Sequence, residues 1–392
     1  MIGLATSLPA VAEKLYSITD LGTLGGGYSE ANGINNLGQV VGASSTLSGS
    51  HAFRTAPNSP INPSTDDLGV LNDSCISRAR ADGEGSSTAY GINDLGQVVG
   101  LTRFFFSNRS SSEAFRTAPN SPINPATDGL GSFYFNGTFV FCGIYGGEAY
   151  SINNLGQVVA TVISPVPQAF LTAPNRPINP ATDNLGSLAV SASETHAKGI
   201  NNFGQVVGSS YTRPTGGREH AFRTPPNSLI QALSNHSIIR LPKAWNFGLT
   251  YNAYMQRPIN PSTDDLGTLG GASSNANGIN DLGQAVGSSE TASGDTHAFR
   301  TAPNSPINPS TDDLGTLGGR RSVANGINNF GQVVGSSSIA TTANGDTHAF
   351  LYDEGQMLDL NNLIPTGSNF VLRTANAINN KGQIVGSGSI NG

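Results

Sequence analysis

Four of the six histidines of this chain recur at one place in a repeated pattern, each followed by Ala-Phe. Imidazole is well suited to acid–base chemistry and metal binding near neutral pH. The set comprises His51, His220, His297 and His348, and Glu113 and Gln168 occupy the same slot in two further copies. Because each histidine belongs to a different copy, a metal site would require the copies to face a common centre. We therefore expect structural or surface-polar roles, with a histidine metal ring as the alternative.

Adjacent aspartates form a second repeated feature. The pairs are Asp66-Asp67, Asp264-Asp265 and Asp312-Asp313, each directly after Ser-Thr. Carboxylates and loop carbonyls can hold Ca²⁺, but the alternating acidic spacing of a dedicated calcium loop is absent from the sequence. Asp side chains also cap turns by accepting hydrogen bonds from nearby backbone N–H groups. We expect turn capping, with Ca²⁺ binding as the alternative, and predict no other cofactor.

The motifs of common enzymes are absent from the sequence. It contains no G-x-S-x-G elbow, H-E-x-x-H zinc motif, P-loop or paired C-x-x-C. No Ser, His and acidic residue stand apart from the repeats as a catalytic triad would. We therefore assign no catalytic residue.

Three segments depart from the repeated pattern and are the places where a unique site could lie. Residues 71–90 and 132–150 are enlarged linkers, and they contain the two cysteines of the chain, Cys75 and Cys142. A disulfide between them suits an exported protein, and two separate thiols are the alternative.

The third departure, residues 229–256, is an insertion into a loop. We expect a tolerated insertion, with a ligand-binding flap as the alternative. The side chains that such a flap would use are Arg240, Lys243, Trp245, Tyr251 and Tyr254.

A decapeptide, GINNLGQVVG with close variants, organises these features into seven copies. Its isoleucines are Ile34, Ile92, Ile152, Ile200, Ile279, Ile327 and Ile378. The pattern predicts a strand ending at Ile, a tight Asn-Asn-x-Gly turn and a return strand beginning at Gln-Val-Val. Asn tolerates positive φ and forms Asx turns, while Gly adopts the left-handed conformation of a bulged hairpin loop. HAF and DLG segments follow as two more strands, so each copy is predicted to be a four-stranded antiparallel meander.

Seven such meanders are typical of the blades of a β-propeller. We predict a single all-β domain over residues 15–392. Its blades lie at about 28–69, 89–131, 148–186, 197–267, 276–315, 324–361 and 375–392. Residues 15–22 form a DLG strand that we expect to close the seventh blade, which lacks an HAF strand unless residues 387–392 replace it. An open array of β-repeats is the alternative.

Composition limits the class of partner. Charged residues make up 12% of the chain, and 49 Gly and 22 Pro make turns abundant. A net charge of -6 without Lys or Arg runs argues against nucleic acid. No apolar stretch approaches about 20 residues, so no membrane span is predicted. Residues 1–12, ending in Ala-Val-Ala, are typical of the end of a secretory signal peptide and predict an extracellular or periplasmic location.

The three motifs GINNxGQVVG, HAF and DLGTLGG together resemble those of the bacterial HAF family of extracellular repeat proteins, seen also in cyanobacteria. The resemblance covers residues 16–386 and implies a repeat fold and export, without any catalytic residue. We expect an exported, monomeric and non-enzymatic binding or surface-interaction module whose partner is a protein or a glycan. The alternative is a propeller enzyme, a polysaccharide lyase or hydrolase, with an acidic or histidine site on the axis.

Overall fold

The computed structural model describes residues 16–47, 49–71, 85–106, 109–131, 146–164, 166–189, 193–213, 217–226, 258–340 and 346–390. These residues form small antiparallel β-sheets and the short 3-10 helix η2 (Leu360–Asn362), and no α-helix occurs among them. The predicted all-β class is confirmed. Within the described ranges, no helix has the length and hydrophobicity needed to cross a membrane.

The strands recur in the order of the motifs. The first strand of each repeat is β1 (Ser29–Ile34), β5 (Ser86–Ile92), β8 (Gly147–Ile152), β11 (Thr195–Ile200), β15 (Gly270–Ile279), β18 (Gly318–Ile327) or β22 (Phe370–Ile378). The second is β2 (Val40–Ser45), β6 (Val98–Phe106), β9 (Val158–Ser164), β12 (Val206–Tyr211), β16 (Ala285–Thr291), β19 (Val333–Ile339) or β23 (Ile384–Ile390). The HAF strands are β3 (Ser50–Arg54), β7 (Arg109–Arg116), β10 (Val166–Leu171), β13 (Glu219–Arg223), β17 (Thr296–Arg300) and β20 (Thr347–Asp353). The fourth strands are β4 (Asp67–Gly69), β14 (Asp265–Gly267) and β21 (Gln356–Asp359).

Within a repeat these strands pair as an antiparallel meander in chain order, as predicted. The fourth strand is short, because the Gly that ends DLG adopts positive φ, as Gly69 does at 72°. In the second, third and fifth repeats it is reduced to one bridge: Phe115 to Gly129, Phe170 to Asn184, and Phe299 to Asp313. One parallel pair, Thr296 with Arg321, joins the fifth and sixth meanders into a single sheet.

The seventh repeat differs from the prediction. It contains β22 and β23 alone among described strands, and residues 16–22 contain no strand, so the predicted closing strand is wrong in its secondary structure. Residues 387–390 continue β23 and do not form the missing HAF strand. Leu21 O nevertheless accepts a hydrogen bond from Ile61 N at 2.8 Å, as Leu68 O does from Ile123 N in the next repeat. Residues 16–22 therefore bond like a DLG segment without being a strand.

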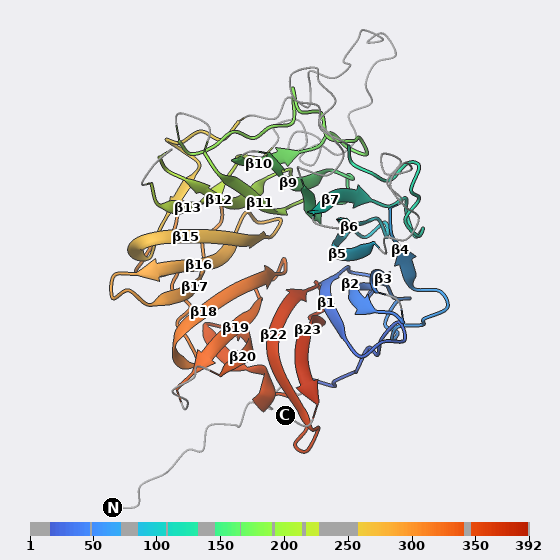
Figure 1. Ribbon diagram of the computed structural model, residues 1–392. Coiled ribbons are helices and arrows are strands. Elements are labelled where there is room, and N and C mark those ends of the chain that lie inside the picture. The colour runs from blue at the N-terminus through green and yellow to red at the C-terminus, as the bar shows by residue number, and fades with distance from the viewer. Residues whose placement is uncertain are drawn as a thin grey trace, which may run out of the picture.

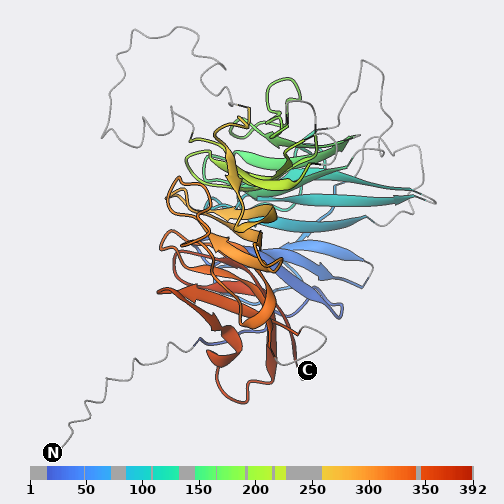
Figure 2. The same cartoon turned by 90° about the vertical axis from the view of Figure 1, so that its left-hand side faces the viewer.

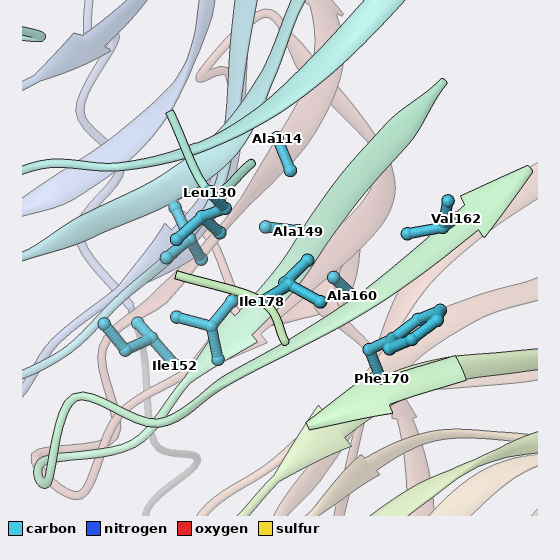
Figure 3. Close-up of a cluster of buried hydrophobic side chains, with 10 residues drawn as sticks. Ala114, Leu130, Ala149, Ile152, Ala160, Val162, Phe170 and Ile178 are labelled. Atoms are coloured by element: carbon cyan, nitrogen blue, oxygen red, sulfur yellow. The ribbon is translucent and has the colours of Figure 1, made fainter. Parts of the chain in front are cut away.

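The hydrophobic core lies between consecutive repeats. Figure 3 shows one such cluster, in which Ala114 and Leu130 come from the second repeat and Ala149 and Phe170 from the third. Small residues on the first strands and the phenylalanine of HAF recur in these clusters because facing sheets must interdigitate. Burial of the apolar residues of a repeat therefore depends on its neighbours.

The first and last repeats meet in the same way. Leu24, Phe53 and Ile61 pack in one cluster with Val385 of β23. The cluster between the fourth and fifth repeats has equivalent members, Leu269, Phe299, Ile307 and Val207. Figure 1 shows the sheets following one another around a common centre, with β23 beside β1, and Figure 2 shows them edge-on.

Candidate functional site

The Asn-Asn-x-Gly turn is built mainly by its first asparagine. Asn35 Oδ1 accepts hydrogen bonds from the backbone N–H groups of Leu37 and Gln39, and Gly38 has a φ of 84°. The predicted Asx turn and left-handed glycine are therefore confirmed, whereas the asparagines of this turn do not adopt positive φ. The Nδ2 group of Asn35 donates to Gln39 Oε1 at 2.8 Å within the hairpin, and it also bonds outside its own turn.

That Nδ2 group links each repeat to the next. It donates to the backbone oxygen of the equivalent asparagine of the following repeat, over 2.9–3.1 Å. From donor to acceptor, the order of the residues is Asn35, Asn93, Asn153, Asn201, Asn280, Asn328, Asn379 and again Asn35. We call this closed cycle the asparagine ring. Hairpin geometry thus accounts for three of the four hydrogen bonds of the Asn35 side chain, and the fourth crosses to the next repeat.

A second cycle runs parallel to the asparagine ring through the next position of the turn. Each backbone N–H donates to the side-chain Oδ1 of the following repeat at 2.9–3.0 Å. Its members are Asn36, Asp94, Asn154, Asn202, Asp281, Asn329 and Asn380. Burial raises the pKa of Asp94, but hydrogen bonds from Asn36 and Asn154 outweigh it and leave the pKa lowered. The Ile-Asn-Asn and Ile-Asn-Asp triplets of all seven repeats line a polar cavity of about 170 Å³.

The first strands carry another repeated asparagine, two residues before the Ile of the decapeptide. Its Nδ2 donates to an alanine carbonyl of the next first strand at 2.9–3.0 Å. These bonds run from Asn32 to Ala89, Asn277 to Ala324, Asn325 to Ala375, and Asn376 to Ala31. In the second, third and fourth repeats the position holds Tyr90, Tyr150 and Lys198 instead. Three adjacent repeats therefore lack this structural asparagine.

These three side chains form one cluster, which we call the Tyr-Tyr-Lys cluster. The rings of Tyr90 and Tyr150 are stacked, with centroids 5.4 Å apart and an interplanar angle of 28°. Lys198 Nζ lies 3.6 Å from the centroid of the Tyr150 ring, and the Tyr150 hydroxyl donates to Glu148 Oε2. The cluster thus presents aromatic surface, an ammonium group and a carboxylate on neighbouring first strands.

The electrostatics of the cluster keep its phenols protonated. Burial raises the pKa of Tyr150, and the hydrogen bond to Glu148 raises it further. Burial and the charges of Glu148 and Glu30 raise the pKa of Tyr90. Burial lowers the pKa of Lys198, against the opposing effects of Glu148 and Glu219. The site therefore offers hydroxyl donors and an ammonium group, not a phenolate base.

Reverting Lys198→Asn to the repeat residue should stabilise the fold by about 1 kcal/mol. The variant removes a half-buried ammonium group, and its amide can donate to the carbonyl of Ala276 as Asn277 donates to that of Ala324. Urea unfolding measures the difference. The reverse change in the next repeat, Asn277→Lys, should destabilise the fold by a similar amount. A Lys198→Asn variant less stable than the wild type would contradict this account.

The histidines of the HAF motif pair with the aspartates of DLG in their own sheets. The Nδ1 to carboxylate distances are 2.6–3.0 Å for His51–Asp67, His220–Asp265, His297–Asp313 and His348–Asp359. Where the slot holds Gln168, the partner is Asn184, at 2.9 Å. Where it holds Glu113, the partner position is Gly129, whose Cβ would lie 2.5 Å from Glu113 Oε1. The two motifs are thus halves of one cross-strand pair.

This pairing predicts a pH dependence for Asp265→Asn. Burial raises the pKa of Asp265, but hydrogen bonds from His220 and Gly267 N outweigh it, so the folded-state pKa is lowered. The stabilisation is complete above the unfolded-state pKa and is lost as pH falls through the folded-state pKa. Urea unfolding should show the variant less stable at about pH 7, with the difference vanishing toward about pH 2. A difference that stays constant over this range would refute the assignment.

The first aspartate of each acidic pair caps its own turn. Asp66 Oδ2 accepts from Asn62 N at 2.8 Å, and its Oδ1 accepts from Thr65 Oγ1 at 2.9 Å. Asp264 and Asp312 are bonded in the same way. The predicted turn capping is confirmed. Within the described ranges, no three His, Cys, Asp or Glu side chains are grouped as they would be around a metal ion.

The remaining predicted sites lie outside the described residues. They are Cys75 and Cys142, and Arg240, Lys243, Trp245, Tyr251 and Tyr254 of the insertion. The Tyr-Tyr-Lys cluster was not predicted, although aligning the residues before each decapeptide would have shown Asn replaced in three adjacent repeats. The same repeats contain the enlarged linkers and the insertion. No model of a known protein family matches this chain, and the comparison with curated proteins found no match.

Proposed function

We propose that the seven repeats form a closed seven-bladed β-propeller and that the protein is an exported, non-enzymatic module that binds a glycan at the Tyr-Tyr-Lys cluster. The observation that carries the proposal is the replacement of a structural asparagine by Tyr90, Tyr150 and Lys198 in adjacent repeats. Residues that break a repeat and give up a hydrogen bond are best explained by function.

Hydrogen bonds between the seventh and first repeats support closure over an open array. Asn379 Nδ2 donates to Asn35 O and Asn380 N to Asn36 Oδ1, as in every other pair of neighbours. Asn376 bonds Ala31 O in the same way. An open array would leave these groups of the terminal repeats to water. In the proposed seventh blade, residues 16–24 take the place of the DLG segment, and β22 and β23 are the two strands.

The chemistry of the cluster supports glycan binding. Aromatic faces carry partial negative charge and pack against the C–H faces of sugar rings. Lys198 supplies N–H donors and Glu148 a carboxylate acceptor, which suit hydroxyl groups that both donate and accept. Export is proposed from residues 1–12 and from the resemblance to the HAF family.

A polysaccharide lyase or hydrolase is less well supported. Both phenols have raised pKa values, which is unfavourable for a tyrosine base. The carboxylates at the axial cavity, Asp94 and Asp281, occupy ordinary repeat positions, where asparagines of neighbouring repeats donate to them.

A panel of soluble oligosaccharides, titrated calorimetrically against the wild type, tests the proposal. Tyr90→Asn and Tyr150→Asn restore the repeat residue and should weaken binding at least about tenfold, equivalent to about 1.4 kcal/mol. Asn277→Ala changes the same position of the fifth repeat and should leave binding within about twofold. No binding in the panel, or unchanged binding in both tyrosine variants, would refute a glycan site here.

A further inference from the structure

The Tyr-Tyr-Lys cluster lies among more carboxylates than cations. Glu148 and Glu219 act on Lys198, Glu194 acts on the neighbouring His196, and Glu30 acts on Tyr90. Lys198 is the cation within the cluster, and the charge of Arg103 acts on Tyr90 from outside it. A ligand carboxylate bound at Lys198 would therefore also lie near Glu148 and Glu219. Repulsion between carboxylates is unfavourable in a half-buried site.

Groups with hydrogen-bonding capacity remain for an uncharged ligand. Tyr150 donates to Oε2 of Glu148, so Oε1 remains as an acceptor. The contact of Lys198 Nζ is the face of the Tyr150 ring, and its N–H groups can still donate. Lys198 Nζ and the Tyr90 ring both contact the Tyr150 ring, so Tyr90 is the better candidate for stacking on a sugar.

A buried hydroxyl beside the cluster also has incomplete hydrogen bonding. Thr161 is 2% exposed and pairs with Glu148 across β8 and β9, so the two side chains lie on the same face of the sheet. Thr161 Oγ1 has no partner among the described residues. Buried hydroxyls in folded proteins are normally bonded to protein, water or ligand.

We infer that the ligand is a neutral, hydroxyl-rich sugar and not a uronate, with Lys198 Nζ donating to one sugar oxygen and Glu148 Oε1 accepting from a neighbouring hydroxyl. The sugar ring packs on the Tyr90 ring. The surrounding glutamates exclude acidic polysaccharides by repulsion. This inference rests on the proposed function and specifies its ligand class.

Calorimetric titration with two matched sets tests it: neutral hexose oligosaccharides, and oligouronates of the same length. At least one neutral oligosaccharide should bind, and every oligouronate should bind at least about tenfold more weakly. Affinity for the neutral ligand should change less than about twofold between low and high salt, because no charge pair forms.

The double variant Glu148→Gln and Glu219→Gln removes two charges and keeps one acceptor oxygen in each side chain, while the other oxygen is replaced by an NH2 donor. It should reduce the difference in affinity between the neutral oligosaccharides and the oligouronates. Thermal unfolding checks that the variant remains folded. An oligouronate that binds more tightly than every neutral ligand would overturn the inference but leave the proposed glycan site standing. Failure of both sets to bind would overturn the site and the inference together.

Discussion

Replacing Asn153 by alanine is expected to lower the free energy of unfolding by about 3–5 kcal/mol. The side chain is 3% exposed. Its Nδ2 donates to Gln157 Oε1 and Asn201 O, and its Oδ1 accepts from Leu155 N and Gln157 N. Alanine would leave several of these buried groups without partners, and each unsatisfied group costs about 1–3 kcal/mol. Urea denaturation monitored by circular dichroism measures the loss.

Leu155→Ala is the matched control, because Leu155 belongs to the same turn but is 41% exposed. It should change stability by no more than about 0.5 kcal/mol. A loss below about 1 kcal/mol for Asn153→Ala would mean that the asparagine ring contributes little to stability.

Leu24→Ala is expected to cost about 2–5 kcal/mol, because a buried leucine is replaced by a cavity. Leu24 precedes the first repeat, yet it packs with Phe53 of that repeat and Val385 of the last. Its backbone N–H also donates to Ser44 Oγ at 2.8 Å. The measurement is again the free energy of unfolding in urea.

The matched variant is Leu269→Ala, at the equivalent position between the fourth and fifth repeats, where Leu269 N donates to Ser289 Oγ at 2.8 Å. A closed ring predicts losses for the two variants that agree within about 1 kcal/mol. An open array would make Leu24 a terminal residue, so a negligible loss there beside a large loss at Leu269 would refute closure.

The sequence by itself determined the repeat, its strand order and its turns. Period-two strands, the Asx turn at Asn35 and the positive φ of Gly38 all depend on contacts within a few residues. Local contacts of this kind are set by the side chains of one decapeptide. The capping role of Asp66 followed from the same local chemistry.

The partners of the same side chains across repeats were decided by tertiary structure. Asn153 Nδ2 reaches Asn201, 48 residues away, and Asn379 reaches Asn35 across 344 residues. Such bonds depend on how one sheet packs on the next, which the decapeptide does not encode locally. The pairing of His with Asp likewise required the register of the HAF and DLG strands.

Two features could be found only once the repeats were placed side by side. Residues 16–22 bond as a DLG segment without strand structure, because packing against Ile61 and the last repeat replaces the missing ladder. Successive members of the set Tyr90, Tyr150 and Lys198 are 60 and 48 residues apart in sequence, and they meet because adjacent first strands bring equivalent positions together. Packing between repeats, not the repeat itself, created the candidate site.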